Sequence, residues 1–444
     1  MIVFVAIITI SFLVMVYLIS KIFTNNLYSP IRIFCIWWAV CLGMSLYPVW
    51  GRNIASNTIY LSILVAMISF IIGAVLGKKK YIFGNYYSKE DILVGNLPNI
   101  EPPRVLFILN CISLMLNIWL FFRCFSLFGI SMFVDIGSAR SGIYASDAVL
   151  RSSIDVYLHS YLLRGALYTV LIMFPSVFGK KEHKRAMVFS LVNVLFYTFI
   201  YGGRMFLFYM AILLMIGLGL RNFLEDNNIK AKRLFVIYRN RDKKFGMYIM
   251  ITIMAIVVVA LTFSRNNSSH KNGIQYFIEK SMTYFSSAPA YYEYLQNGTY
   301  AAEQSGFLFT FIGGLITFFS RINGIIGYNL IPDVVSIASS HLTSNLVNVG
   351  GSVYTNAFPT MVYTFRFDFN YLGVIFNSML FGFISEKMYK RARIFRNSKY
   401  YFLYLVALYF IIESPMRWSG QQFWPVFVVC TILLTTKDRR QNNN

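Results

Sequence analysis

The chain is divided into a series of nearly uncharged apolar segments, and this feature limits its fold more than any other. The stretch 58–76, for example, contains no charged residue. A helix needs about 20 mostly apolar residues to cross the hydrocarbon core of a bilayer, and several segments reach or approach that length. Because the apolar residues are continuous and do not alternate with polar ones, they favour membrane helices over the strands of a β-barrel.

The composition agrees with a protein of this class. Of the 444 residues, 57% are hydrophobic and 13% are charged, whereas a soluble domain carries about 25% charged residues. We therefore expect an all-α, polytopic membrane protein with about 11 transmembrane helices. The first segment lacks a basic region and a small-residue cleavage site, so we interpret it as a retained helix. The predicted spans are 1–20, 32–49, 58–76, 104–128, 157–178, 186–201, 204–220, 247–263, 371–386, 400–413 and 422–436.

Basic clusters between the spans indicate the orientation of the chain. When the spans alternate in direction, every cluster falls on one side, which the positive-inside rule makes cytoplasmic. The N-terminus then lies outside and the C-terminus inside. The formal net charge of +22 lies mostly in these short loops, so we expect membrane lipids, and no nucleic acid, as partners. The clusters are 77–81, 179–185, 221–244, 387–399 and the C-terminal Lys-Asp-Arg-Arg.

This orientation places two long segments on the outer side of a single membrane domain, 1–444. They are a first outer loop, 129–156, and a large outer loop, 264–370, which we expect to form a lid that binds substrate. Within the large loop, the spacing of apolar residues in 274–285 predicts an interfacial helix. The segment 305–319 is strongly apolar but short, and we expect an in-plane or re-entrant element there.

Away from the predicted cytoplasmic side, arginine dominates the basic residues, and Lys271 and Lys280 are the exceptions. A guanidinium binds phosphate in a bidentate way and stays charged when partly desolvated, so the set favours an anion site. The alternative for each residue is a structural role, such as snorkelling to headgroups or pairing with an outer acid. The set comprises Arg52, Arg123, Arg140, Arg151, Arg164, Arg204, Arg265, Arg321, Arg366 and Arg417.

Arg204 has an unusual setting within this set. It follows Gly202 and Gly203, which suit a tight turn, and it precedes a predicted span. The N-terminus of a helix carries free N–H groups and a positive dipole end, so a cation there is disfavoured unless an anion lies nearby. Arg204 therefore predicts a phosphate site on the outer face.

Three stretches together resemble one family of membrane enzymes. They are YGGR at 201–204, YFSSAPAYYEYL at 284–295 and TNAFPTMVYTFRFDFNYLG at 355–373. The combination resembles the Wzy-type oligosaccharide repeat unit polymerases, the O-antigen polymerases in particular. The family usually has Asp-Phe-Gly in the third stretch, whereas this chain has Asp368, Phe369 and Asn370, with Gly373 following.

The resemblance implies a multi-pass enzyme of the bacterial inner membrane with its site on the periplasmic face. A glycan on undecaprenyl diphosphate would be transferred to the next lipid-linked repeat unit, with release of undecaprenyl diphosphate. A flippase and a chain-length regulator of the same pathway are possible further partners. We expect no cofactor and no metal, because no paired-acid motif such as Asp-x-Asp occurs on the predicted outer side and the sequence has no nucleotide-binding loop.

The reaction implied by the resemblance needs cations for the leaving diphosphate, a base for the acceptor hydroxyl and a surface for the glycan. The residues assigned to catalysis are Asp368, Arg204 and His341, with Asp368 as the first choice of base and His159 and Glu413 behind it. An ion pair with an arginine is the structural alternative for Asp368. The diphosphate-binding set is Arg204, Arg140, Arg164, Arg265, Arg321, Arg366 and Arg417, and the glycan-binding set is Tyr284, Tyr291, Tyr292 and Tyr363.

Two other functions remain open at this point. An O-antigen ligase acting on lipid A core would share the arginines and the large outer loop. A lipid-linked oligosaccharide flippase would carry charged groups through the bilayer midplane, often in repeated halves. The arginines of this chain cluster toward the outer face and no internal repeat is visible, which favours the polymerase.

The assignment of Arg204 makes a first testable prediction. Arg204→Ala should abolish polymer without changing the amount of protein in the membrane, because the diphosphate loses its cation. Arg204→Lys should also be impaired, because lysine cannot bind phosphate in a bidentate way. Polymer length on gels and immunoblots of membranes measure the two effects, and polymer of normal length in Arg204→Ala would refute the diphosphate site.

Overall fold

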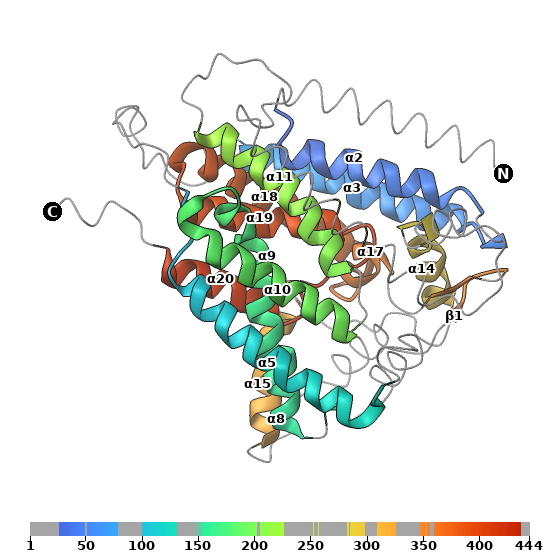
Figure 1. The fold of residues 1–444 in the computed structure, drawn as a ribbon. Coiled ribbons are helices and arrows are strands. Elements are labelled where there is room, and N and C mark those ends of the chain that lie inside the picture. The colour runs from blue at the N-terminus through green and yellow to red at the C-terminus, as the bar shows by residue number, and fades with distance from the viewer. Residues whose placement is uncertain are drawn as a thin grey trace. The chain divides into compact units, whose positions relative to one another are not determined.

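The computed structural model is mostly helical (Figure 1). One small antiparallel sheet joins β1 (Val347–Asn348) to β2 (Tyr354–Thr355), an element that the sequence did not predict. The helical class is confirmed. The structure describes residues 26–48, 51–78, 100–130, 149–150, 152–201, 205–225, 252, 256, 282–283, 285–297, 309–325, 347–351, 353–355 and 359–436.

Nine of the predicted spans coincide with helices. The two others, 1–20 and 247–263, lie outside the described residues except for 252 and 256. The span predicted at 157–178 is a composite, since α8 (Ser153–Val156) and the π-helix η2 (Tyr157–Leu163) precede α9 (Arg164–Val177). The other helices at predicted spans are α2 (Pro30–Ser45), α3 (Asn57–Lys78), α5 (Val105–Phe128), α10 (Lys184–Tyr201), α11 (Met205–Glu225), α18 (Asn370–Phe395), α19 (Ser398–Glu413) and α20 (Trp424–Thr435).

Four described segments are long and apolar enough to cross a membrane. They are Asn57–Lys78, Val105–Phe128, Ile154–Val177 and Met205–Glu225. Shorter apolar helices occur at Pro30–Ser45, Phe309–Phe319 and Trp424–Thr435. The membrane character expected from the sequence is therefore confirmed, while the full set of spans and their orientation remain a prediction.

The described part of the predicted large outer loop, 264–370, contains helices as well as the β1–β2 hairpin. Helix α14 (Ala288–Asn297) follows the predicted interfacial helix 274–285, of which only residues 282, 283 and 285 are described. Helix α15 (Phe309–Ile325) covers residues 309–319 of the apolar segment 305–319 and extends beyond it, while 305–308 lie outside the described residues. A further short helix, α17 (Thr360–Phe365), ends just before α18.

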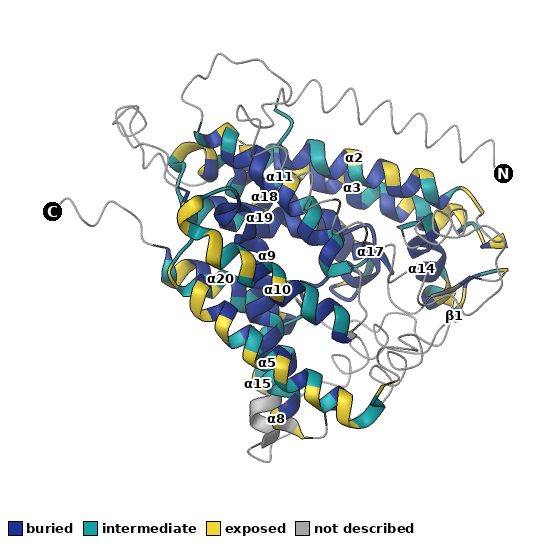
Figure 2. Cartoon of the chain, in the orientation of Figure 1, coloured by how far each residue is buried: buried dark blue, intermediate teal, exposed yellow. Residues whose placement is uncertain are grey.

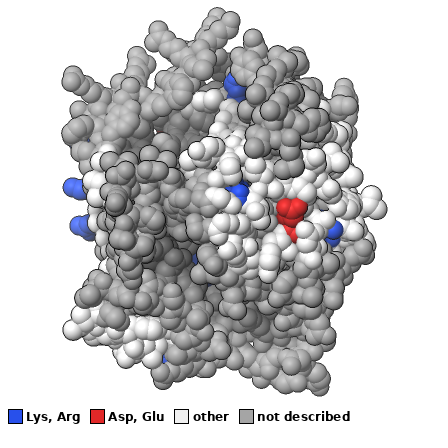
Figure 3. All heavy atoms as spheres, turned by 90° about the vertical axis from the view of Figure 1, so that its right-hand side faces the viewer, with Lys and Arg blue, Asp and Glu red and all other residues white. Residues whose placement is uncertain are grey.

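The contacts group the chain into two compact units. Unit 1 comprises residues 1–94, 274–391 and 407–422, and unit 2 comprises 95–273, 392–406 and 423–444. Figure 2 shows that α9 of unit 2 is buried, whereas α5 carries many exposed residues. The exposed residues of α5 include apolar ones such as Phe107 and Met115, and on the face drawn in Figure 3 uncharged residues make up most of the described surface. Such an apolar exterior suits contact with lipid.

In unit 2, a series of buried amides joins α5 to α10. The Nδ2 of Asn193 donates to the backbone O and the Oδ1 of Asn110 at 2.9 and 3.1 Å. Asn110 in turn donates to Ser190 Oγ at 3.0 Å, and Asn117 donates to Asn193 Oδ1 at 3.3 Å. Asn110 and Asn117 are two helical turns apart, so both face α10. Hydrogen bonds between membrane helices contribute about 0.6 kcal/mol each on average, and here they also fix the register of the two helices.

In unit 1, glycines bring α3 and α18 into close contact. A Cβ added to Gly73 would lie 1.8 Å from the carbonyl O of Met379, and one added to Gly382 would lie 2.0 Å from that of Phe70. Gly77, four residues after Gly73, faces the carbonyl O of Phe383 in the same way. Small residues at this spacing let two membrane helices approach until their backbones touch.

The glycine contact predicts a stability defect. Gly73→Ala and Gly382→Ala should each lower the free energy of unfolding by roughly 1–3 kcal/mol, as overpacking does elsewhere. Gly43→Ala in α2 is the matched control, because a Cβ there meets nothing within 4 Å. Thermal unfolding of the detergent-purified variants measures the effect, and equal melting temperatures for all three would contradict it.

Candidate functional site

Within the third motif of the sequence, residues 366–369 form a turn between α17 and α18 in unit 1. All residues of α17 are buried, and α18 begins at Asn370. The turn between them carries Arg366 and Asp368, and only 2% of Asp368 is exposed. A carboxylate at this depth needs specific partners to stay charged.

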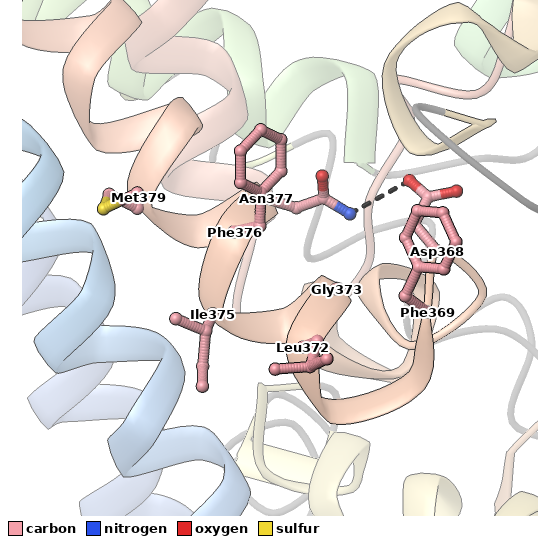
Figure 4. Close-up of a pocket in the computed structure, with 8 residues that line it drawn as sticks. All are labelled: Asp368, Phe369, Leu372, Gly373, Ile375, Phe376, Asn377 and Met379. Carbon is pink, nitrogen blue, oxygen red and sulfur yellow. Dashed lines mark hydrogen bonds between the residues drawn. The ribbon is translucent and has the colours of Figure 1, made fainter.

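The two oxygens of Asp368 have different surroundings. Its Oδ2 accepts hydrogen bonds from the backbone N–H of Thr310 at 3.1 Å and from Asn377 Nδ2 at 3.0 Å. The second of these is drawn in Figure 4. Thr310 lies at the start of α15, so Oδ2 caps one of the free N–H groups of that helix and is favoured by its dipole. The Oδ1 is buried and has no hydrogen-bond partner among the described residues.

The backbone after Asp368 is strained. Phe369 and Asn370 have φ angles of +62° and +56°, in the left-handed region that bulky residues avoid. Asparagine is among the few residues other than glycine that visit this region routinely. Asn370 thus adopts the conformation that the glycine of the Asp-Phe-Gly pattern is suited to. Gly373 is also required, since a Cβ there would lie 1.4 Å from the carbonyl O of Asp368.

Arg366 is held beside this turn by an amide and two aromatic rings. Its Nε donates to Asn370 Oδ1 at 3.1 Å, and its Nη1 donates to the hydroxyl of Tyr292 at 3.4 Å. The guanidinium carbon lies 4.8 Å from the ring centroid of Tyr371 and 5.9 Å from that of Tyr292. Burial raises the pKa of Tyr292 although Arg366 opposes the shift, so its hydroxyl stays protonated. Arg366 is therefore fixed in direction two residues from Asp368.

A cavity of about 390 Å³ opens beside Asp368. Apart from Asp368 and Asn377, the residues that line the cavity are apolar. Figure 4 shows that most of them lie on the first turns of α18. Such a cavity suits an apolar chain that ends in a polar group next to the carboxylate. The lining residues are Asp368, Phe369, Leu372, Gly373, Ile375, Phe376, Asn377 and Met379.

The predicted tyrosines that are described lie inside unit 1. Tyr291, Tyr292 and Tyr363 are all buried. The rings of Tyr292 and Tyr363 pack edge to face with their centroids 5.7 Å apart. Their burial favours a packing role, and glycan stacking on them remains a prediction.

The predicted arginines are only partly described. Arg366 and Arg417 belong to unit 1, and Arg417 donates from its Nε to Glu413 Oε1 at 2.6 Å. Arg164 begins α9 in unit 2 and is half-buried. Arg321 lies in α15, but its side chain is not described. The remaining predicted site residues, Arg204, Arg140, Arg265, His341 and Tyr284, lie outside the described residues, so the convergence of the set stays a prediction.

Two arginines of the wider outer set have structural partners. Arg52 is 2% exposed and donates to the backbone carbonyls of Ser45, Tyr47 and Ser286. Arg123 pairs with Asp155 and also donates to a backbone carbonyl. The structural reading therefore holds for both residues.

The sequence did not single out the groups that support Asp368. Asn377 is a polar residue inside an apolar span, which is itself a sign of function or packing, and Thr310 acts through its backbone. No group of three or more His, Cys, Asp or Glu side chains that could hold a metal ion occurs in the described part of the chain. A comparison of the chain with known protein families, with curated proteins and with solved structures finds no match.

The strained turn can be tested at Asn370. Asn370→Val should lower the free energy of unfolding by about 1–2 kcal/mol relative to Asn370→Gly, because a β-branched residue resists the left-handed conformation. Both variants lack the amide that binds Arg366, so the comparison isolates the backbone. Thermal unfolding in detergent measures the difference, and equal stability of the two would show that the turn relaxes.

Proposed function

We propose that this chain is a glycosyltransferase of the bacterial inner membrane that polymerises undecaprenyl-diphosphate-linked oligosaccharide repeat units, as an O-antigen polymerase of the Wzy type does. The growing glycan is transferred at the periplasmic face onto the next lipid-linked unit. The observation that supports this proposal best is the buried carboxylate of Asp368, whose Oδ1 has no described partner at the edge of an apolar cavity.

The proposed chemistry assigns a role to that free oxygen. The acceptor hydroxyl attacks the anomeric carbon of the donor glycan and loses its proton, which Asp368 Oδ1 accepts as general base. The bond from the anomeric carbon to the diphosphate oxygen breaks, and its electron pair leaves with undecaprenyl diphosphate. Arg366 supplies positive charge beside the turn, and Arg204 belongs to the same proposal as a second cation for the leaving group.

The apolar cavity fits the lipid part of this substrate. An isoprenoid chain lies in the bilayer and needs an apolar path to bring its diphosphate to the polar groups. Phe369, Leu372 and Phe376 line the cavity and are all exposed, so an apolar surface leads to Asp368. A carboxylate next to such an apolar surface has an unfavourable free energy unless a polar group of a ligand binds it.

A ligase acting on lipid A core would use the same groups, so the test has to separate the two activities. A deletion strain of a polymerase makes lipopolysaccharide capped with a single repeat unit. A deletion strain of a ligase has uncapped core and accumulates long lipid-linked chains, and loss of a flippase leaves repeat units trapped on the cytoplasmic side. Either of the last two phenotypes would refute the polymerase.

Within the polymerase proposal, Asp368→Asn should abolish the ladder of polymer lengths. Asparagine keeps an oxygen for the Thr310 N–H and so preserves the cap of α15, but it cannot take the proton. Glu293→Gln is the control, an acid of α14 that accepts a hydrogen bond from Ser56 at the surface. Purified variants reconstituted with lipid-linked repeat unit, with and without chelator, provide the measurement, and full activity of Asp368→Asn would remove it as the base.

A further inference from the structure

The turn that follows α19 contains a second buried carboxylate. Glu413 is the last residue of α19 and is completely buried. The C-terminal end of a helix dipole disfavours an anion, and burial adds the cost of desolvation. A glutamate at this position therefore depends on partners close by.

The partners of Glu413 meet on one oxygen. Its Oε1 accepts from Arg417 Nε at 2.6 Å, from Ser419 Oγ at 2.8 Å and from the Tyr409 hydroxyl at 3.2 Å. The Oε2 is buried and has no hydrogen-bond partner in the described part of the chain. The pair is not the bidentate arrangement that arginine and carboxylate frequently form. Glu413 holds the guanidinium at its Nε.

Other groups hold the same turn from several sides. Trp37 Nε1 donates to the carbonyl O of Ile412 at 2.7 Å, and Trp38 Nε1 donates to Ser414 Oγ at 2.8 Å. On the far side of the turn, Trp418 Nε1 donates to the carbonyl O of Thr310 at 2.8 Å. Because the N–H of Thr310 binds Asp368, one residue of α15 contacts both the Asp368 turn and the turn that follows Glu413.

Arg417 differs in exposure from Arg52 and Arg221, although the paired Arg123 is also partly exposed, at 32%. Arg52 and Arg221 are almost fully buried and donate to backbone carbonyls. The side chain of Arg417 is 23% exposed, although the carboxylate that holds it is not exposed at all. A cation with a fixed direction and access to the outside is suited to bind an anion.

We propose that Glu413 is a positioning residue that orients Arg417 toward the diphosphate of the lipid-linked substrate. This inference rests on the proposed function and adds to it a residue that does not touch the substrate. Glu413 holds the Nε edge, and the Nη1–Nη2 edge binds the diphosphate oxygens. Glu413 therefore acts on substrate affinity through Arg417 and has no separate effect.

The test is a double-mutant cycle on reconstituted protein with purified lipid-linked repeat unit. Glu413→Gln should raise the apparent KM for that substrate about tenfold, within the range of couplings between contacting residues, with a smaller change in kcat. In an Arg417→Ala background, the same substitution should add no further rise. Glu413→Asp keeps the charge but shortens the side chain, and it should raise the KM in the same way. It replaces Glu413→Gln in the experiment if that variant does not fold.

Glu225→Gln is the matched control for this experiment. Glu225 forms the corresponding pair four residues after Arg221, at 4.0 Å, and its loss should leave the KM unchanged. A wild-type protein that makes no ladder would refute the proposed function itself. A wild-type ladder together with an unchanged KM in Glu413→Gln and Glu413→Asp would overturn only the inference, as would a KM rise that persists in the Arg417→Ala background.

Discussion

A polar group inside a membrane protein has to find its partner within the protein, because the hydrocarbon core offers no water. In unit 1 this constraint is met at the Asp368 carboxylate. One oxygen binds the start of α15 through the Thr310 N–H and the first part of α18 through Asn377. These two hydrogen bonds join α15 to the turn and to α18, which follow it at a distance in the sequence. They also hold the backbone of Phe369 and Asn370 in a conformation that it would otherwise leave.

The same constraint separates the arginines of the outer set by role. A guanidinium enclosed by backbone carbonyls, such as Arg52, has both terminal nitrogens bound within the protein and serves the fold. Arg366 and Arg417 are held differently, by aromatic faces and an amide in one case and by a carboxylate in the other. Both retain some exposure. The arginines that the sequence favours over lysine therefore fall into two groups, those held by backbone carbonyls and those held by other side chains. Only the local contacts in the structure tell the two groups apart.

The sequence predicted the helices well because the apolar period of a membrane helix is a local signal. It also singled out Asp368 and Arg366 through their motif and their position before a span, and their roles stay a prediction. It could not identify Thr310, whose contribution is a backbone N–H, or the convergence of Ser419 and Tyr409 on Glu413. The π-helix at the start of the fifth span and the small hairpin were also missed. These features depend on tertiary contacts and on backbone angles that no residue pattern specifies.

The described part of unit 1 carries costs that packing does not explain. A buried polar atom without a partner costs about 1–3 kcal/mol, and both Asp368 Oδ1 and Glu413 Oε2 are in that position. The left-handed backbone after Asp368 adds about 1–2 kcal/mol for a residue with a side chain. These costs are large, because proteins are stable by only about 5–15 kcal/mol in total. Apolar residues in place of Asp368 and Glu413 would avoid them and give a more stable unit. The backbone of Thr310 binds both Asp368 and Trp418, and a ligand that donates a hydrogen bond to Asp368 Oδ1 would recover the cost at that oxygen.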